Sequence, residues 1–294
     1  MTTVGLFDSG VGGLSVLIPL TNLSPNTNFI YLADQSHCPY GSLPPDKILS
    51  RSFAITDTLL SHGASLIVLA CNTATSAALT ALRERHPSVP FVGMEPAVKP
   101  AARQTRTGHI GVLATQTTAQ SERLASLIDR FGGAGKPHGG DAEAAGVRRT
   151  RAERIHVHVH VPEGLVQLVE AGAGESDQAE TLLAPTIHHW LQLGVDTIVL
   201  GCTHYPFARR TIQRLAGPTT TIIDPTPAVA HHAASLLRTT CHPSEARDRS
   251  EGSVASTRPR LTFLTTSDPL TLKSTITHLA PTLLTHSAFN HLST

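Results

Sequence analysis

The chain has few aromatic residues and no excess of charge of either sign. Aromatic residues make up 4% of its 294 residues, with a single tryptophan, and 23 basic against 22 acidic residues leave a formal net charge of +1. Proteins that hold nucleic acid need basic residues against phosphates, often with aromatic side chains on which bases stack. Anionic membrane surfaces likewise attract basic clusters. We therefore expect neither nucleic acid nor a membrane as a partner.

Long apolar segments and closely spaced cysteine pairs are also missing. The N-terminus has no basic segment before an apolar stretch, which argues against a signal peptide, and no run is long enough to cross a membrane. The four cysteines include no Cys-x-x-Cys pair, so we expect no structural zinc site. These features predict a cytoplasmic protein whose cysteines are thiols.

Short apolar runs alternate with helical patterns along the chain. Hydrophobic residues make up 40% of the sequence, enough for a sizeable core. Continuous apolar runs are typical of strands that are covered on both faces, as in parallel sheets. Helical periodicity appears at 50–62, 74–85 and 121–131, and a last helix is expected from about Pro269. The predicted strands are 4–7, 29–32, 66–69, 91–92, 110–113, 197–200, 221–223 and 261–264.

Two segments resemble each other and indicate an internal duplication. Residues 4–9 open one series of strands and helices, and residues 110–115 open a second. We therefore predict an α/β fold of two similar domains with mainly parallel sheets flanked by helices, and an active site in the cleft between them. The first domain is expected to comprise residues 1–93 plus 208–294, and the second residues 94–207. Glycines and an arginine cluster at 132–154 predict a flexible insertion there.

Cys71 and Cys202 occupy matching positions. Each follows an apolar strand that ends in a small residue, and each precedes residues that can cap a helix. Two thiols that flank one pocket suit a reaction in which one group removes a proton and another delivers one. A helix N-terminus can lower the pKa of a thiol, so we expect both cysteines to be reactive near neutral pH. A lone cysteine after a strand is more often a small buried apolar residue.

Other candidate residues lie at predicted strand ends. Asp8 begins a glycine-rich loop that lacks the spacing of nucleotide-binding loops; it is placed to meet an ammonium group or to orient a neighbouring acid, and simple helix capping is the alternative. Thr115, Thr118 and Ser121 follow the strand at 110–113 and suit either carboxylate binding or capping. Tyr40 and Gly41 form a turn with a free hydroxyl and N–H, and His204 lies near enough to Cys202 to assist it.

Some residues are assigned structural roles. Cys38 and Cys241 lack the context of the matched cysteines, although Cys38 is close to the turn at Tyr40. His156, His158 and His160 alternate and would share one strand face. Metal binding there is the lesser alternative, and we expect a solvated edge strand with no metal.

In order along the chain, these segments resemble the glutamate racemases of the aspartate/glutamate racemase superfamily. The resemblance covers most of the chain and is carried by 7–16, 39–41, 70–73, 93–96, 115–121, 168–170 and 201–206. It departs from the family pattern at Val161-Pro162, where a Cys-Pro pair is usual, with one extra residue before Glu170.

The resemblance implies a reaction without a cofactor, in which Cys71 and Cys202 exchange the α-proton of glutamate. Asp8 and His204 would tune the two thiols, with Glu170 supporting His204. The product D-glutamate would serve peptidoglycan synthesis, and a homodimer is expected. The resemblance further implies that glutamate is bound by Asp8, Ser9, Tyr40, Gly41, Asn72, Thr73, Thr203 and His204, and we add Thr115 and Thr118 from their position.

Three alternatives remain open from the sequence. One is another racemase or a decarboxylase of the superfamily, acting on aspartate, hydantoins or another carboxylic substrate. A second is a non-catalytic binding module, for which the only sequence indication is the basic cluster at 148–151. A third, a thiol hydrolase with a Cys–His pair, leaves the second matched cysteine without a role.

Overall fold

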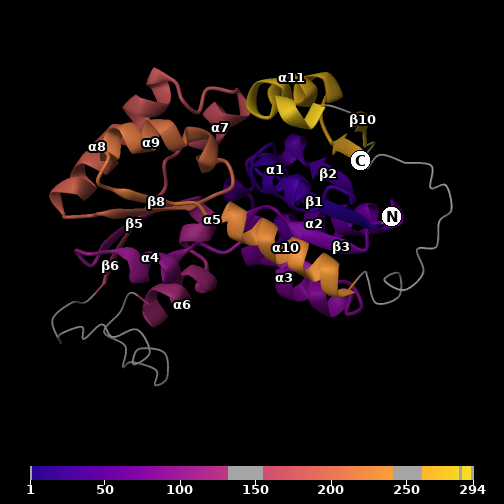
Figure 1. Ribbon diagram of the computed structural model, residues 1–294, viewed down its shortest axis with the longest axis horizontal. Helices are drawn as coiled ribbons and strands as arrows, with labels where there is room; N and C mark the ends of the chain where they lie inside the picture. The colour runs from indigo at the N-terminus through magenta and orange to yellow at the C-terminus, as the bar shows by residue number, and fades with distance from the viewer. Residues whose placement is uncertain (1, 132–154, 241–259, 285–286, 293–294) are drawn as a thin grey trace, which may run out of the picture.

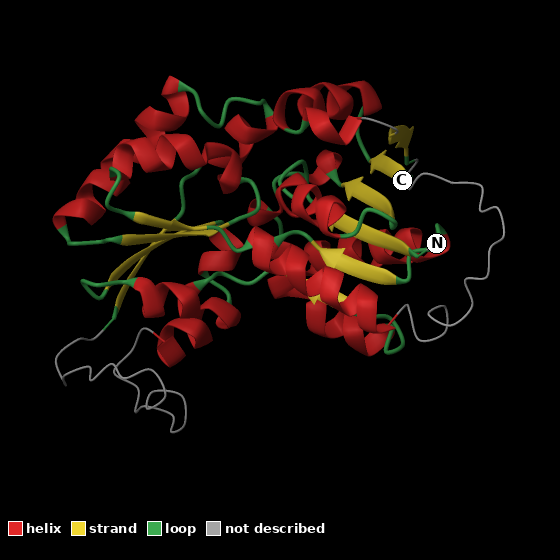
Figure 2. Ribbon diagram, viewed as in Figure 1, coloured by secondary structure: helices red, strands yellow, loops and turns green. Residues whose placement is uncertain are grey.

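The computed structural model describes residues 2–131, 155–240, 260–284 and 287–292. Within these residues ten strands form two sheets, and every strand pair is parallel (Figures 1 and 2). The predicted α/β class with two mainly parallel sheets flanked by helices is confirmed. The insertion predicted at 132–154 and Cys241 lie outside the described residues.

The first sheet has six strands in the order β10-β9-β2-β1-β3-β4. Alternate residues of β1 face opposite cores, because Val4 and Leu6 pack with α1, α10 and α11, and Phe7 packs with α2 and α3. The strands are β1 (Thr3–Asp8), β2 (Asn28–Ala33), β3 (Leu66–Leu69), β4 (Phe91–Gly93), β9 (Leu261–Thr265) and β10 (Ser287–His291); the helices are α1 (Leu14–Leu23), α2 (Pro45–Ser61), α3 (Asn72–Arg85), α10 (Thr226–Thr240) and α11 (Pro269–Leu279).

The second sheet has four strands in the order β6-β5-β7-β8. Its two faces are covered by α7, α8 and α9 on one side and by α4 and α6 on the other, above and below the strands in Figure 1. The strands are β5 (His109–Ala114), β6 (His156–His160), β7 (Thr197–Gly201) and β8 (Thr221–Ile223); the helices are α4 (Val98–Gln104), α5 (Gln116–Ala119), α6 (Glu122–Phe131), α7 (Leu165–Glu170), α8 (Asp177–Gln192) and α9 (Arg209–Ala216).

The boundary between the two units differs from the predicted one. We predicted that the first unit resumes at residue 208, but β8 pairs with β7 and α9 packs against α8. Residues 209–223 therefore belong with the second sheet. The chain returns to the first unit at α10, which packs against α1. The strand in the segment 209–223, β8, has only three residues. So short a strand does not indicate from the sequence which sheet it joins.

The internal resemblance corresponds to matching places in the two sheets. β1 lies between β2 and β3, and β5 lies between β6 and β7. In both cases the strand that carries a cysteine at its end, β3 or β7, is the neighbour of the strand that opens the series. Because carboxyl ends of parallel strands meet at one edge, this arrangement gathers the polar residues of each sheet on one side.

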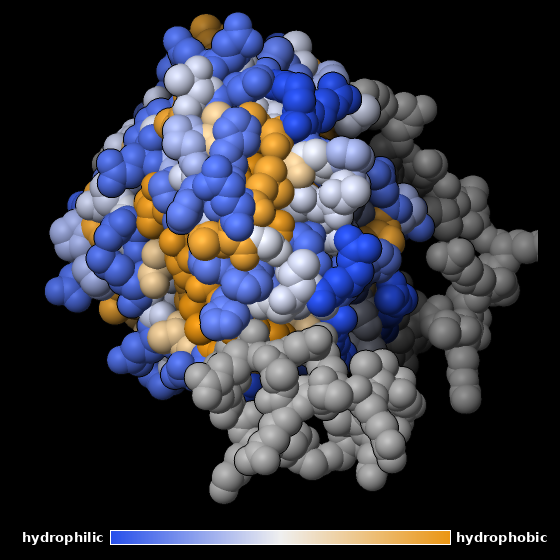
Figure 3. Space-filling view, turned by 90° about the vertical axis from the view of Figure 1, so that its left-hand side faces the viewer, coloured by the Kyte–Doolittle hydropathy of each residue, from blue (hydrophilic) through white to orange (hydrophobic). Residues whose placement is uncertain are grey.

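Strand β6, with its three histidines, is the edge strand that we predicted. His156 and His158 both stack on His109, at 4.8 and 5.4 Å between ring centroids. The end of the molecule where β6 and α8 lie faces the viewer in Figure 3. Apolar side chains gather in the middle of this face, and polar ones surround them. Exposed large apolar residues of the second unit include Val159 of β6 and Leu191 of α8. No helix among the described residues is both long and apolar enough to cross a bilayer.

Candidate active site

Cys71 and Cys202 line the same cavity, one from each unit. Cys71 follows β3 and is the N-cap residue of α3, and Cys202 follows β7. Both thiols are buried, with 5% of each residue exposed. The cavity has a volume of about 10 Å³. Its walls are formed by Ser9, Pro39, Tyr40, Gly41, Cys71, Asn72, Thr73, Thr115, Val166, Cys202, Thr203 and His204.

Burial controls the protonation of Cys71. Its Sγ accepts a hydrogen bond from the backbone N–H of Ala74 in the first turn of α3, at 3.5 Å. Burial nevertheless raises the pKa of the Cys71 thiol well above its ordinary value, and the negative charge of Asp8 raises it further. The expected lowering of this pKa by the helix N-terminus is therefore wrong, since one N–H does not offset the loss of solvation. Cys71 rests as a neutral thiol.

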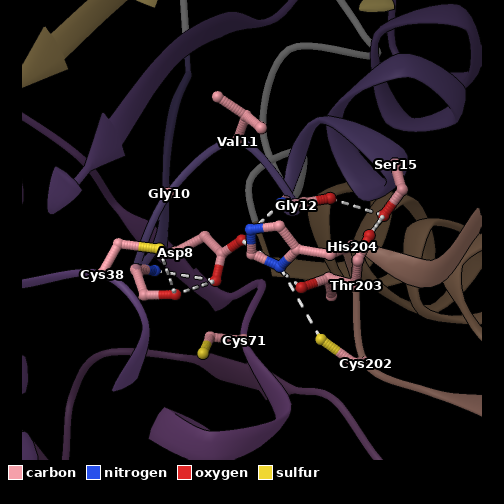
Figure 4. A network of polar contacts seen from close by, with 12 residues as sticks. Asp8, Gly10, Val11, Gly12, Ser15, Cys38, Cys71, Cys202, Thr203 and His204 are labelled. Carbon is pink, nitrogen blue, oxygen red and sulfur yellow. Dashed lines mark hydrogen bonds and ion pairs between the residues drawn. The ribbon is translucent and has the colours of Figure 1, made fainter. Parts of the chain in front are cut away.

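Cys202 has a different environment, because His204 lies against its sulfur. The Nδ1 atom of His204 is 3.7 Å from Cys202 Sγ (Figure 4). Its Nε2 atom is 2.6 Å from Oε1 of Glu170. Burial lowers the pKa of His204, but its contacts with Cys202, Cys38 and Glu170 outweigh burial and raise that pKa well above 6.5. His204 is thus an imidazolium with an N–H that can stabilise negative charge on the sulfur.

Glu170 is held in place as the partner of His204. It is the last residue of α7, and its Oε1 also accepts the backbone N–H of Val11 at 2.7 Å. Burial raises the pKa of Glu170, but the hydrogen bond and positive charge of His204 reverse this and keep it below its usual value. Gln35 donates to the second oxygen at 3.3 Å. The extra residue before Glu170 in the sequence has not displaced it from His204.

The glycine-rich loop after β1 makes room for this ion pair. A Cβ atom on Gly10 would lie 1.8 Å from Glu170 Oε1, and one on Gly12 would lie 2.3 Å from His204 Nδ1. A glycine-rich loop can let a ligand approach the backbone closely. In the structure the groups that approach Gly10 and Gly12 are side chains of the protein itself, and the residue of this loop that lines the cavity is Ser9.

Asp8 lies behind the cavity wall and is fully buried. Its carboxylate accepts the backbone N–H groups of Ser9 and Gly13, at 2.7 and 2.6 Å, and the hydroxyl of Thr203 at 3.3 Å. Burial raises the pKa of Asp8, although the positive charge of His204 opposes this. The aspartate therefore ties the start of α1 to the segment after β7, which holds Cys202. Asp8 thus supports the turn before α1 and orients the segment that holds Cys202.

Tyr40 is fixed by a buried carboxylate. It begins a short 3-10 helix (Tyr40–Ser42), and its hydroxyl donates to Oδ2 of Asp34 at 2.5 Å. Arg51 donates to both oxygens of Asp34, through Nε at 2.9 Å and Nη2 at 2.8 Å, and Thr266 donates to Oδ1 at 2.9 Å. The Tyr40 hydroxyl is thereby committed to Asp34, so its ring rather than its hydroxyl is what shapes the cavity.

Thr73 and Thr115 connect the two units in the cavity wall, and the side chain of Asn72 has no hydrogen-bond partner. The hydroxyls of Thr73 and Thr115 lie 2.9 Å apart, and Thr115 also donates to the hydroxyl of Thr118 at 2.9 Å. The amide nitrogen and oxygen of Asn72 are buried without a hydrogen-bond partner. A buried amide without a partner costs free energy, which a polar ligand in the cavity would recover.

Most predicted site residues meet at this cavity. Ten of them line it directly, whereas Asp8, Glu170 and Thr118 lie in the layer behind. The sequence reasoning missed Pro39 and Val166. Val166 has no polar group, so its residue type does not mark it as part of a site. The three histidines of β6 are not among the lining residues, and the arginines at 148–151 lie outside the described residues.

Comparison with known proteins gives a consistent result. The family model of Asp/Glu/hydantoin racemases matches residues 21–233. A curated glutamate racemase of Roseiflexus sp. (strain RS-1) is 43% identical over 235 residues, which cover 80% of this chain and 79% of the relative. A glutamate racemase of Pseudomonas aeruginosa is 44% identical over 234 residues, 80% of this chain and 81% of the relative.

Solved structures of glutamate racemases share the fold. That of Escherichia coli, in complex with L-glutamate and the activator UDP-MurNAc-Ala, has a TM-score of 0.74 and 29% identity, and the match covers 99% of this chain and 98% of that one. The isoform RacE1 of Bacillus anthracis has a TM-score of 0.74 and 26% identity, with 99% and 97% covered.

Proposed function

Because the chain belongs to the Asp/Glu/hydantoin racemase family, we propose that it interconverts L- and D-glutamate by a two-base proton transfer at Cα. One thiolate takes the α-proton, the electron pair stays on Cα as a carbanion delocalised into the carboxylate, and the second thiol delivers its proton to the opposite face. The proposal needs no cofactor. The observation that carries it is the pair of buried thiols, one from each unit, in the wall of a single cavity.

The environments of the two cysteines suit opposite roles. Cys71 is a neutral thiol because burial and Asp8 raise its pKa, so it is the proton donor in this state. Cys202 lies beside an imidazolium, whose N–H stabilises a thiolate, so it is the base. After one turnover the proton has moved from Cys71 to the substrate, and from the substrate to Cys202. The enzyme must then return the protons to their original places or run in reverse.

The polar groups of the wall suit an amino acid with two carboxylates. Asn72 offers a buried amide without a partner at the N-terminus of α3, a helix of 14 residues, where N–H groups favour an anion. Thr73, Thr115 and Thr203 add hydroxyls from both units, and Ser9 and Gly41 also line the cavity. Such donors stabilise the charge that develops on the substrate during proton removal.

The small volume of the cavity implies that the units move apart to admit substrate. A volume of about 10 Å³ is enough for one water molecule. Glutamate has about ten times as many non-hydrogen atoms as water, so it does not fit in the closed cavity. Contacts such as that between Thr73 and Thr115 cross between the units and would break and re-form in each cycle. Closure excludes water, which strengthens the electrostatic contacts to the carbanion.

The test follows the optical activity of D-glutamate without added cofactor, and deuterium uptake at Cα in heavy water. We expect decay of optical rotation with the wild type and none with Cys71→Ala or Cys202→Ala. Normal turnover by either variant would refute the two-base assignment. L-Aspartate and hydantoins are run in parallel, since faster exchange with either would identify a different member of the family.

We also propose a use for the product and a compartment for the protein. D-Glutamate made by this chain would serve peptidoglycan synthesis, as its resemblance to the glutamate racemases implies. The thiols of Cys38, Cys71 and Cys202 are free, and a reaction that depends on thiols favours the reducing cytosol. The homodimer stays a prediction, and sedimentation velocity at enzyme concentrations used for the assay measures it.

A further inference from the structure

A third cysteine lies near the ion pair of the site and has no role in the proposed reaction. Cys38 is part of the loop before Tyr40, and its Sγ lies 4.0 Å from the hydroxyl of Ser9. Its sulfur, a ring nitrogen of His204 and a carboxylate oxygen of Glu170 all lie within 4.8 Å of one another. Among the described residues, these three form the group whose donor atoms are close enough to share one metal ion.

The three donors are chemically matched to zinc. Thiolate sulfur, imidazole nitrogen and carboxylate oxygen are the ligands that Zn²⁺ takes in proteins, at about 2.3, 2.0 and 2.0–2.2 Å. In tetrahedral coordination such ligands lie about 3.3–3.6 Å apart. The His204 Nε2 and Glu170 Oε1 atoms are already 2.6 Å apart, so small side-chain shifts would suffice. Glu170 is further held by Val11 and Gln35, which orients its carboxylate as outer-shell partners orient metal ligands.

Access to the group is separate from access to the substrate cavity. His204 lines the cavity, whereas Cys38 and Glu170 do not. The side chain of Glu170 is 18% exposed, and Cys38 is partly exposed as well. An ion can therefore approach the carboxylate and the thiol from outside while the cavity is closed.

We propose that Cys38, His204 and Glu170 form an inhibitory site for Zn²⁺, which rests on the proposed racemisation only for its effect on activity. The ion takes the place of the proton between His204 and Glu170 and displaces the proton of the Cys38 thiol. Coordination at Nε2 leaves the Nδ1 atom of His204 facing Cys202. The ion instead links Cys38, which belongs to the first unit, to His204 and Glu170 of the second. Zinc therefore holds together the units that must separate to admit substrate, and it stops turnover without entering the substrate cavity.

The first measurement is zinc affinity, which is independent of activity. Apoprotein, prepared with chelator and reductant, competes for Zn²⁺ with a chromophoric chelator. We expect one tight site per chain, weakened about 100-fold or more by Cys38→Ser, because serine keeps the size of cysteine but is a poor zinc ligand. Cys71→Ser is the matched control, since it removes a thiol of the cavity outside the group, and it should bind zinc as the wild type does.

The second measurement uses Co²⁺ as a spectroscopic substitute for zinc. A thiolate-to-metal charge-transfer band should appear in the wild type and in Cys71→Ser, and be absent in Cys38→Ser. Zinc should also inhibit D-glutamate turnover by the wild type far more than by Cys38→Ser. Equal zinc affinity of Cys38→Ser and the wild type, or loss of binding in Cys71→Ser instead, would overturn the site. If no racemisation is found, the affinity and the cobalt band still decide the question of the site.

Discussion

The buried pair of Asp34 and Arg51 provides a quantitative test of how the first unit supports the site. Asp34 is fully buried, and the side chain of Arg51 is 16% exposed. Arg51→Met keeps the length and apolar part of the side chain and removes both hydrogen bonds to the carboxylate. Each charge-assisted bond contributes about 1.5–3 kcal/mol, and breaking a buried pair costs about 3–5 kcal/mol. We expect the free energy of unfolding to fall by about 3–5 kcal/mol at neutral pH.

The pH dependence gives this prediction a second readout. Burial raises the pKa of Asp34, but hydrogen bonds from Arg51 and Tyr40 outweigh it, and the pKa lies below its ordinary value. A lowered pKa contributes stability that is present above the unfolded value, about 3.9, and is lost as the pH falls through the folded value. Without Arg51, burial has more weight and the pKa of Asp34 rises. The variant then gains protons in the folded state, so its deficit narrows as the pH falls.

The assay is urea unfolding followed by far-ultraviolet circular dichroism, at about pH 7 and about pH 4. Arg123→Met is the control, because Arg123 pairs with Glu95 at 2.9 Å but the two side chains are 40% and 47% exposed. An exposed pair contributes about 0–1 kcal/mol. A loss for Arg51→Met no larger than that of the control, or a deficit that does not change with pH, would refute the reasoning.

Three further predictions concern the ion pair and the second sheet. Gly12→Ala places a Cβ atom 2.3 Å from Nδ1 of His204 and so displaces the imidazole ring. This displacement should lower kcat about 100-fold, with a smaller effect on KM. Steady-state kinetics with D-glutamate measure both, and an unchanged kcat would contradict the prediction. Glu170→Gln removes a group that raises the pKa of His204, so this pKa should fall, and the high-pH limb of kcat/KM should move to lower pH if it reports the imidazolium. Gly111→Ala puts a Cβ atom 2.5 Å from the Trp190 ring and should destabilise the second unit by about 1–3 kcal/mol; Trp190 is the single tryptophan, so its fluorescence reports the transition, and an unchanged midpoint would count against the packing.

The strands and the junction cysteines were predictable because their signals are local. A continuous apolar run such as 66–69 indicates a strand covered on both faces, and β3 has these bounds. The helix at 177–192 was not predicted, although it carries a serine N-cap and buries Leu183, Ile187 and Trp190. Its interior includes Pro185, and proline is normally a helix breaker. Strand β10 has an exposed edge position and a mixed composition, so no run marks it.

The environment of the site was predicted less well than its residues. A helix N-terminus near Cys71 can be inferred from sequence, but the burial that raises the pKa of this thiol depends on packing of both units. The role of Gly10 and Gly12 depends in the same way on α7 and the segment after β7, which are far along the chain. Pairwise contacts between distant segments leave no local pattern, so they had to come from the structure.

The order in which the strands are joined has a consequence for how the protein is made. β5 to β8 lie between β4 and α10 in the chain, so a ribosome that has released residues up to about 225 has delivered every described strand of the second sheet. At that moment the first sheet still lacks β9, its neighbour for β2, and α10, the cover of α1. The edge of β2 stays unpaired until the C-terminal segment emerges, and an unpaired edge invites association with other chains. A chain that ended after β8 would thus have a complete second sheet and an incomplete first sheet, whose unpaired edge at β2 favours aggregation.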